Sequence, residues 1–207
     1  MLKLVKKLHA NGLYFDLGGG RGLVEELYKK DNVSIVIGDF SVPMMRTRNE
    51  SFSSTSQIQM DAFKMPFRAN IFDGVFSFLG DPYALQEVFG GVLRILKPNG
   101  FFLLTLPSKI WAENLRPFLG VELNETRFIT RDGKLVNIPS FVFGTVDLRV
   151  TLLDVGFKKV KAGEWQSLNL ISKEEFSKDI LTSARNLGIS PENLPLITYA
   201  LAWKGGI

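Results

Sequence analysis

The chain has no cysteine and a single histidine, His9, among its 207 residues. Without cysteine there is no disulfide framework, thiolate nucleophile or cysteine-ligated metal, and one imidazole is too few for a histidine zinc site. We therefore expect no bound metal. No stretch approaches the ~18 uninterrupted apolar residues of a membrane helix, so we expect no membrane span. The first residues, MLKLVKKLHANG, are too interrupted for a secretory signal, and we expect a cytoplasmic protein.

Charge of either sign is also modest. The 25 lysines and arginines exceed the 21 acidic residues by four, a net charge of +4 that permits a nucleic-acid partner without requiring one. The hydrophobic content of 45% is ordinary for a globular protein. The length suits one α/β domain, and no repeat or linker divides the chain. We predict a single domain over residues 1–207.

Short apolar runs alternate with helical patterns in the first half of the chain. The fifth run, FFLLTL, is apolar at every position, which is typical of a strand covered on both faces. We expect helices over 23–30, from an N-cap at Ser41, and over 83–96, and strands over 13–17, 33–37, 57–60, 71–79 and 101–106. This alternation indicates an α/β fold with a doubly wound, mostly parallel sheet.

The second half begins with a different pattern. Two β-type runs, 127–131 and 134–138, flank Asp132-Gly133, which predicts a hairpin with a two-residue turn. Further along we expect a helix over 146–153, a strand over 158–161, a helix over 172–187 and a last strand over 196–203, at or near a sheet edge. Ser172 and Glu175 form the capping box of that second helix. The sheet would then have seven strands, with a hairpin insertion after the fifth.

The stretch DLGGGRG at 16–22 has the composition of a ligand-binding turn. Bare backbone between a strand and a helix lets N–H groups approach a ligand closely. The glycines at 18, 20 and 22 give G-x-G-x-G instead of the dinucleotide pattern G-x-G-x-x-G. Asp16 would repel a pyrophosphate, so a cationic ligand is favoured. Tight packing of the turn is the structural alternative.

Four more motifs follow in order: GDFSVPMM at 38–45, MDAFKMPF at 60–67, FDGVFSF at 72–78 and LKPNG at 96–100. With DLGGGRG they make the chain resemble the class I S-adenosylmethionine-dependent methyltransferases, in particular the small-molecule enzymes typified by the ubiquinone/menaquinone methyltransferases. The resemblance covers residues 13 to about 106. It implies a Rossmann-like fold, S-adenosylmethionine as cofactor and S-adenosylhomocysteine as product.

The resemblance also implies a set of cofactor-binding residues. Asp16 would hold the methionine ammonium, Asp39 both ribose hydroxyls, and Asp61 the adenine amino group. Asp39 could instead be a solvated strand-end acid, and Asp61 a helix cap. Asp73 is a structural position in the family pattern and is not part of the predicted site. The other implied contacts are Gly18, Gly19, Gly20, Gly22, Phe40, Met44, Ala62, Phe63, Phe78 and Leu79.

Methyl transfer from a sulfonium is an in-line displacement to which a protein contributes mainly by alignment. A side-chain base is needed only when the accepting atom must lose a proton. The weak candidates for such a base are His9, Asp81 and Tyr83. His9 could equally be a surface residue, and Asp81 could begin a helix.

Recognition of the methyl acceptor should come from outside the motifs. We divide the domain into a short N-terminal helix (1–12), a cofactor-binding core (13–106), a substrate-side insertion (107–145) and the C-terminal part of the sheet (146–207). The hairpin is the candidate lid, with an aromatic lining of Trp111, Phe128, Phe141 and Phe143. Packing of these rings on the sheet is an equally good interpretation.

Several functions remain open from the sequence. A small-molecule acceptor is favoured, and RNA or protein is the first alternative because of the basic charge. A non-catalytic, S-adenosylmethionine-binding regulatory subunit is the second, and a homodimer is compatible with either. The glycine spacing and Asp61 argue against a nicotinamide dehydrogenase.

Overall fold

The structure is a computed structural model that describes residues 11–28, 33–46, 56–130, 132–165 and 176–206. The predicted N-terminal helix, His9 and the capping box Ser172/Glu175 therefore lie outside the described residues. No helix in the described ranges is long and apolar enough to cross a membrane. The strands are β1 (Leu13–Leu17), β2 (Ser34–Asp39), β3 (Ser56–Gln59), β4 (Phe72–Ser77), β5 (Leu96–Pro107), β6 (Glu125–Ile129), β7 (Leu135–Pro139), β8 (Lys159–Trp165) and β9 (Ile197–Trp203).

The α-helices are α1 (Leu23–Leu27), α2 (Val42–Arg46), α3 (Gln86–Ile95), α4 (Lys109–Leu115), α5 (Thr145–Val155) and α6 (Lys178–Leu187). Four 3₁₀ turns complete the described elements: η2 (Ala62–Lys64), η3 (Asp81–Tyr83), η4 (Arg116–Leu119) and η7 (Pro191–Asn193).

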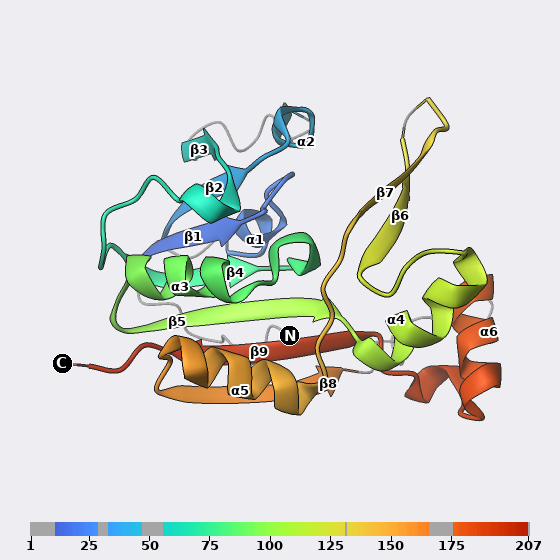
Figure 1. Cartoon of the computed structure of the whole chain (residues 1–207). Helices are drawn as coiled ribbons and strands as arrows, with labels where there is room; N and C mark the ends of the chain where they lie inside the picture. The colour runs from blue at the N-terminus through green and yellow to red at the C-terminus, as the bar shows by residue number, and fades with distance from the viewer. Residues whose placement is uncertain (1–10, 29–32, 47–55, 131, 166–175, 207) are drawn as a thin grey trace.

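Seven strands form one sheet in the order β3-β2-β1-β4-β5-β9-β8 (Figure 1). Within this described sheet β9 runs antiparallel to both of its neighbours, β5 and β8, and the other strand pairs are parallel. The predicted doubly wound, mostly parallel sheet of seven strands is confirmed, and so is the position of the last strand, which is next to the edge strand β8. The strand order reverses between β1 and β4. Ligands of open α/β sheets bind beyond the carboxyl ends of the strands at such a point.

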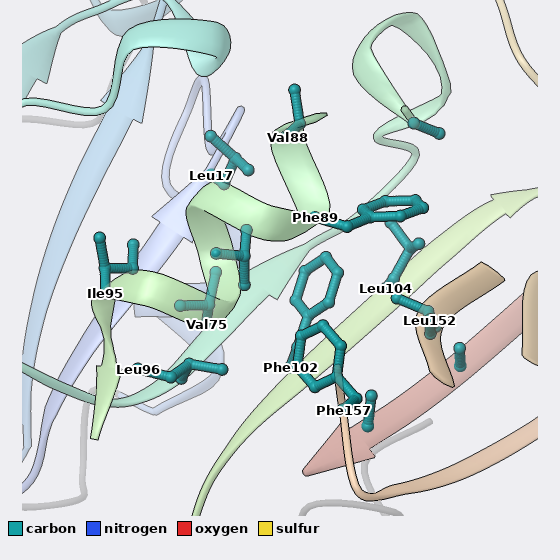
Figure 2. Packing of buried hydrophobic residues seen from close by; sticks show 14 of the residues in the cluster. Leu17, Val75, Val88, Phe89, Ile95, Leu96, Phe102, Leu104, Leu152 and Phe157 are labelled. Carbon is teal, nitrogen blue, oxygen red and sulfur yellow. The ribbon is translucent and has the colours of Figure 1, made fainter. Parts of the chain in front are cut away.

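Two apolar clusters cover the two faces of the sheet. On one face α3 and α5 pack on the sheet, and Figure 2 shows Phe89, Phe102 and Phe157 meeting there. The ring centroids of Phe102 and Phe157 are 6.1 Å apart. On the other face Val24 of α1 packs against Phe76 and its neighbours in β1 and β2. Burial on both sides explains why the central strands are apolar throughout.

The helix expected over 83–96 begins later than predicted. Residues 81–83 form the 3₁₀ turn η3, Leu85 is extended, and α3 begins at Gln86. The apolar spacing is correct from Val88 onward, but the Tyr83 side chain is drawn out of the helical pattern. Its hydroxyl donates a hydrogen bond of 2.9 Å to the carbonyl oxygen of Leu17. Residues 81–83 therefore contact the end of β1, beside the glycine turn, and are not part of α3.

One turn and one helix have features that their sequence patterns do not show. In LKPNG the left-handed residue is Asn99, with φ of 64°, and not Gly100. Gly100 is required for another reason, because a Cβ there would lie 2.9 Å from the carbonyl oxygen of Lys97. The apolar spacing in 23–30 predicts that Leu23, Val24, Leu27 and Tyr28 share one face of the helix. In the structure Leu23 and Leu27 of α1 are exposed.

The insertion after the fifth strand is confirmed as a hairpin, formed by β6 and β7 and separate from the main sheet. Its last strand pair is Ile129 with Leu135, so the connecting loop is longer than the predicted two-residue turn. In Figure 1 the hairpin stands beside the carboxyl ends of the strands, while α6 lies against α4. Gly188 ends α6 in the left-handed conformation.

Candidate functional site at the carboxyl ends of β1, β2 and β4

The glycine turn connects β1 to α1 and is held on two sides. Gly18 has φ of 71°, and a Cβ there would overlap the hydroxyl of Tyr83. At Gly19 a Cβ would overlap the carboxylate of Asp16. The Gly18 N–H donates to the carbonyl oxygen of Gly38 at 2.7 Å, which fastens the turn to β2. Close approach from both neighbours therefore explains why these positions have no side chain.

Asp16 is buried at the end of β1, with 2% of its surface exposed. Burial, together with the neighbouring charges of Asp39 and Glu25, raises the pKa of its carboxyl to about 8. Glu25 is itself buried in α1, and the sequence analysis did not single it out. Three acids thus converge here, an arrangement whose ionisation a cation would favour.

Asp39 ends β2 and reaches back to the glycine turn. Its Oδ2 accepts a hydrogen bond of 2.9 Å from the Gly20 N–H, and its Oδ1 accepts one of 2.7 Å from the Ser41 N–H. Ser41 in turn caps α2, where the Met44 N–H donates to its hydroxyl at 3.4 Å. Asp39 is therefore a fixed carboxylate, and not the freely solvated strand-end acid of the alternative interpretation.

A cavity of about 410 Å³ opens above these groups. The glycine turn and the end of β2 form one wall, and the segment after β4 forms another. The hairpin supplies Phe128 and Ile138 to the same cavity. The full lining is Leu17, Gly18, Gly38, Asp39, Phe40, Ser41, Met44, Met60, Ala62, Leu79, Pro82, Tyr83, Phe128 and Ile138.

Leu79 enters this lining from a strained backbone. Its φ is 53°, a left-handed value that a leucine rarely adopts. Thr105 of β5 holds the conformation, because its hydroxyl accepts the Leu79 N–H at 3.0 Å and its carbonyl accepts the Gly80 N–H at 3.2 Å. Such strain persists where surrounding contacts determine it, and here it turns an exposed apolar side chain toward the cavity.

Comparisons with known proteins identify this architecture. Residues 15–104 match the family model described as a methyltransferase domain. This match makes residues 15–104 an S-adenosylmethionine-dependent methyltransferase domain. Its methyl donor is S-adenosylmethionine. A search of the curated proteins gives no match.

Solved methyltransferase structures share the fold. An S-adenosylmethionine-dependent methyltransferase from Mesorhizobium loti is 15% identical, with 97% of this chain and 95% of that one covered at a TM-score of 0.67. One from Methanosarcina mazei is 16% identical, with 100% and 99% covered and a TM-score of 0.68. Phosphoethanolamine N-methyltransferase 2 from Haemonchus contortus, solved with S-adenosylmethionine, is 15% identical, with 99% of this chain but 51% of that one covered and a TM-score of 0.64.

Six of the thirteen predicted cofactor residues of the methyltransferase line the cavity: Gly18, Asp39, Phe40, Met44, Ala62 and Leu79. The other seven are outside its lining: Asp16, Gly19, Gly20, Gly22, Asp61, Phe63 and Phe78. Phe78 points to the other face of the sheet and stacks on Phe76, with ring centroids 6.1 Å apart. Asp61 caps η2 by accepting the Phe63 N–H at 2.9 Å, which is the helix-cap alternative. That bond also occupies the Phe63 N–H.

The described base candidates of the methyltransferase have structural partners. The hydroxyl of Tyr83 donates to Leu17, and burial raises its pKa above the ordinary tyrosine value. Asp81 is buried outside the cavity lining, where burial raises its pKa and the hydroxyl of Ser140 donates to it. Tyr83 lines the cavity, whereas Asp81 does not. Asp73 pairs with Lys97 at 2.8 Å and accepts the Leu13 N–H at 2.9 Å, as a structural residue.

The predicted aromatic lining of the hairpin is divided between two places. Phe128 contributes to the cavity of the methyltransferase, whereas Phe141 and Phe143 pack against the large core cluster. Those two rings also line a second hollow of about 420 Å³ between α4 and the hairpin base. Trp111 lines neither space. For Phe141 and Phe143, packing is thus the better description.

Proposed function

We propose that the methyltransferase binds S-adenosylmethionine in the 410 Å³ cavity and transfers its methyl group to a small molecule admitted under the hairpin. The observation that carries the proposal is that the glycine turn, Asp16 and Asp39 lie together at the carboxyl ends of β1 and β2. This is next to the point where the strand order reverses, between β1 and β4. A cationic sulfonium and ammonium are the groups that this acidic, phosphate-repelling corner suits best.

Within the cavity, the ligand contacts follow from the placement of the side chains. Asp39 has further lone pairs for the two ribose hydroxyls, and Phe40 and Met44 are exposed apolar groups for the adenine faces. Asp61, between Met60 and Ala62, would reach the adenine amino group from the rim. Asp16 and Gly18, Gly19, Gly20 and Gly22 would hold the amino-acid end, and Leu79 would border the methyl group.

The reaction that we propose is a direct displacement. The acceptor atom donates an electron pair to the methyl carbon and forms a new bond to it as the carbon–sulfur bond breaks. The sulfur keeps the two electrons of the broken bond, which gives S-adenosylhomocysteine. Asp39 and Tyr83 are the ionisable side chains among the described residues of the lining, and both already have partners. We therefore propose catalysis by alignment, with an acceptor whose nucleophile needs no base from these two groups.

Two observations favour a small acceptor over RNA. The cavity is largely apolar, and the described lysines near β8, Lys158, Lys159 and Lys161, lie at the opposite sheet edge. Four strand spacings of about 4.8 Å place that edge roughly 19 Å from β1. The motif resemblance further favours the ubiquinone/menaquinone type of enzyme. Salt-dependent retention on RNA would count against the small-molecule proposal.

The decisive experiment measures cofactor binding at Asp39. S-adenosylhomocysteine at ~100 times its dissociation constant should stabilise the protein by about 2.7 kcal/mol in a thermal shift, and NADH should not. Asp39→Ala should weaken S-adenosylhomocysteine binding by roughly 10- to 100-fold in calorimetry, through the lost ribose bonds. Asp132→Ala, at the exposed hairpin loop, is the matched control and should bind normally. Equal affinity in the two variants would remove Asp39 from the site.

A further inference from the structure

The hairpin that closes one side of the cavity has little packing of its own. β6 and β7 pair only with each other within the described sheets, and most of their side chains are exposed or half-buried. An isolated two-stranded hairpin is marginally stable in water. The position of Phe128 and Ile138 over the cavity must therefore be set where the hairpin joins the body of the protein.

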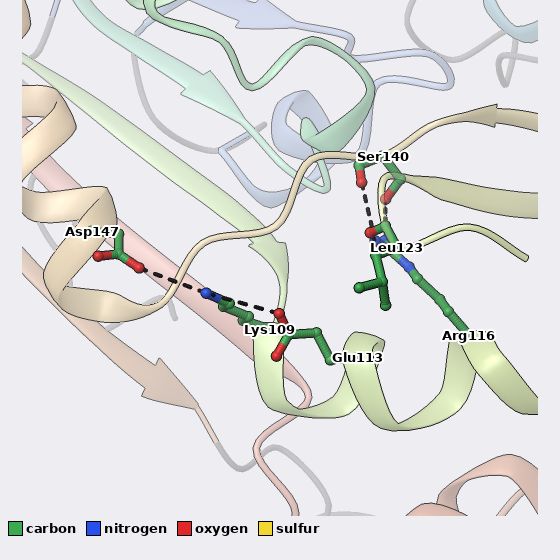
Figure 3. A network of polar contacts seen from close by, with 6 residues as sticks. All are labelled: Lys109, Glu113, Arg116, Leu123, Ser140 and Asp147. Carbon is green, nitrogen blue, oxygen red and sulfur yellow. Dashed lines mark hydrogen bonds and ion pairs between the residues drawn. The ribbon is translucent and has the colours of Figure 1, made fainter.

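At that junction Arg116 joins the two ends of the hairpin. Its side chain is 4% exposed and donates to the carbonyl oxygens of Leu123, before β6, and of Ser140, after β7. The Ser140 contact measures 3.1 Å, and a second bond of 2.5 Å reaches the Ser140 hydroxyl. Figure 3 shows the guanidinium pointing at both residues. A planar fork of donors suits this double attachment, and a lysine would not reproduce it.

Ser140 then connects the hairpin to the segment that follows β4. Its hydroxyl donates to the carboxylate of Asp81, and the carbonyl oxygen of Asp81 accepts the Phe141 N–H at 2.9 Å. Asp81 opens η3, whose other residues, Pro82 and Tyr83, line the cavity. The buried carboxylate of Asp81 and the buried guanidinium of Arg116 thus both bond to the hydroxyl of Ser140. Removing any of the three residues leaves a charge or a polar group without its partner.

We infer that Arg116, Ser140 and Asp81 are positioning residues that hold the hairpin over the proposed cofactor cavity and so govern how long the cofactor product stays bound. The inference rests on the proposed function, because it needs the cofactor in that cavity. None of the three residues lines the 410 Å³ cavity itself. Their effect passes through Phe128 and Ile138 on the hairpin side and through Pro82 and Tyr83 on the β4 side.

The test measures dissociation of S-adenosylhomocysteine from the full chain by surface plasmon resonance, well below every variant's melting temperature. Ser140→Ala should raise the dissociation rate about 5- to 20-fold and leave the association rate within about threefold, because loss of cover acts mainly on the off-rate. Ser140→Thr keeps the hydroxyl and should restore the rate to within about twofold. Ser183→Ala is the matched control, since Ser183 is equally buried but its hydroxyl has no hydrogen-bond partner.

Hydrogen exchange over residues 125–139 supplies the second readout. Ser140→Ala should accelerate exchange in the hairpin, and Asp81→Asn and Arg116→Lys should act in the same direction if Ser140→Ala does not fold. Faster hairpin exchange with an unchanged dissociation rate would overturn the inference, as would no change in either. A wild-type protein that binds no S-adenosylhomocysteine overturns the proposed function and this inference together.

Discussion

An aspartate lies at each end of the parallel strands: Asp73, half-buried, at the amino end, and Asp16, buried, at the carboxyl end. Their electrostatic surroundings are opposite. At the amino end, Asp73 has an ion pair with Lys97 and accepts the Leu13 N–H, so its charge is compensated by the protein itself. At the carboxyl end, all three influences on Asp16, its burial and the charges of Asp39 and Glu25, raise its pKa.

The difference distinguishes an acid that holds the fold together from one that is destabilised by its surroundings. A buried carboxylate that costs free energy in the unbound protein can recover it when a cation binds. The difference between Asp73 and Asp16 also distinguishes two motifs that are equally clear in the sequence. FDGVFSF and DLGGGRG both contain an aspartate before or among small residues, but only the second acid is next to a ligand-sized cavity.

The largest effect is expected from crowding the glycine turn at the carboxyl end. Gly18→Ala puts a Cβ into the Tyr83 hydroxyl at a left-handed position, so we expect S-adenosylhomocysteine binding to fall by more than about 100-fold or the fold to be lost. Gly120→Ala is the control, because Gly120 has φ of 61° but open space around it. It should cost only ~1 kcal/mol in unfolding free energy and leave binding unchanged. Equal losses of binding would show that strain alone matters.

The next largest effect concerns pH and Asp16. Its pKa of about 8 lies above the ordinary 3.8, so the folded protein keeps a proton that the unfolded chain loses. The unbound protein should therefore lose stability as pH rises from about 4 to 8. Cofactor binding should show the opposite trend, because the ammonium prefers the ionised carboxylate. Affinity for S-adenosylhomocysteine should rise about tenfold per pH unit from 5.5 to 7.5.

Calorimetry in two buffers of different ionisation enthalpy measures the proton released by Asp16 on binding. Asp16→Asn removes the group, and its affinity should be weaker and nearly independent of pH over the same range. A wild-type affinity that stays flat between pH 5.5 and 7.5 would mean that Asp16 is already ionised in the unbound protein, and the contrast with Asp73 would lose its basis.

The comparison of the two ends also explains what the sequence could predict. The glycine turn, the Asp39 position and the Ser41 cap are local patterns, set by residues within a few positions of each other, and the structure has them where the motifs placed them. The seven strands follow from apolar runs in the same way. Sequence alone also separated Asp73 from the candidate site, but only through the family resemblance.

What sequence reasoning missed depends on contacts between distant residues. The Tyr83 hydroxyl bonds to Leu17, 66 positions away, and Ser140 bonds to Asp81 across 59 positions. Such pairings leave no periodic signal, so the sequence did not show these partners of Tyr83 and Asp81. Glu25 was missed because α1 shows no marker that turns an acid toward β1. Phe78 follows the strand alternation, which directs it away from the cavity that Leu79 borders.

The smallest effect is expected at the amino end, and it tests the other half of the contrast. Asp73→Asn removes the charge that pairs with Lys97, whose side chain is 41% exposed, so the unfolding free energy should fall by only about 1–2 kcal/mol. Binding of S-adenosylhomocysteine should be unchanged, since Asp73 lies at the opposite end of β4 from the cavity. Thermal denaturation and calorimetry on the same preparation check both values. A loss of affinity at this position would mean that the two ends of the sheet are coupled, and that the compensated acid also serves the site.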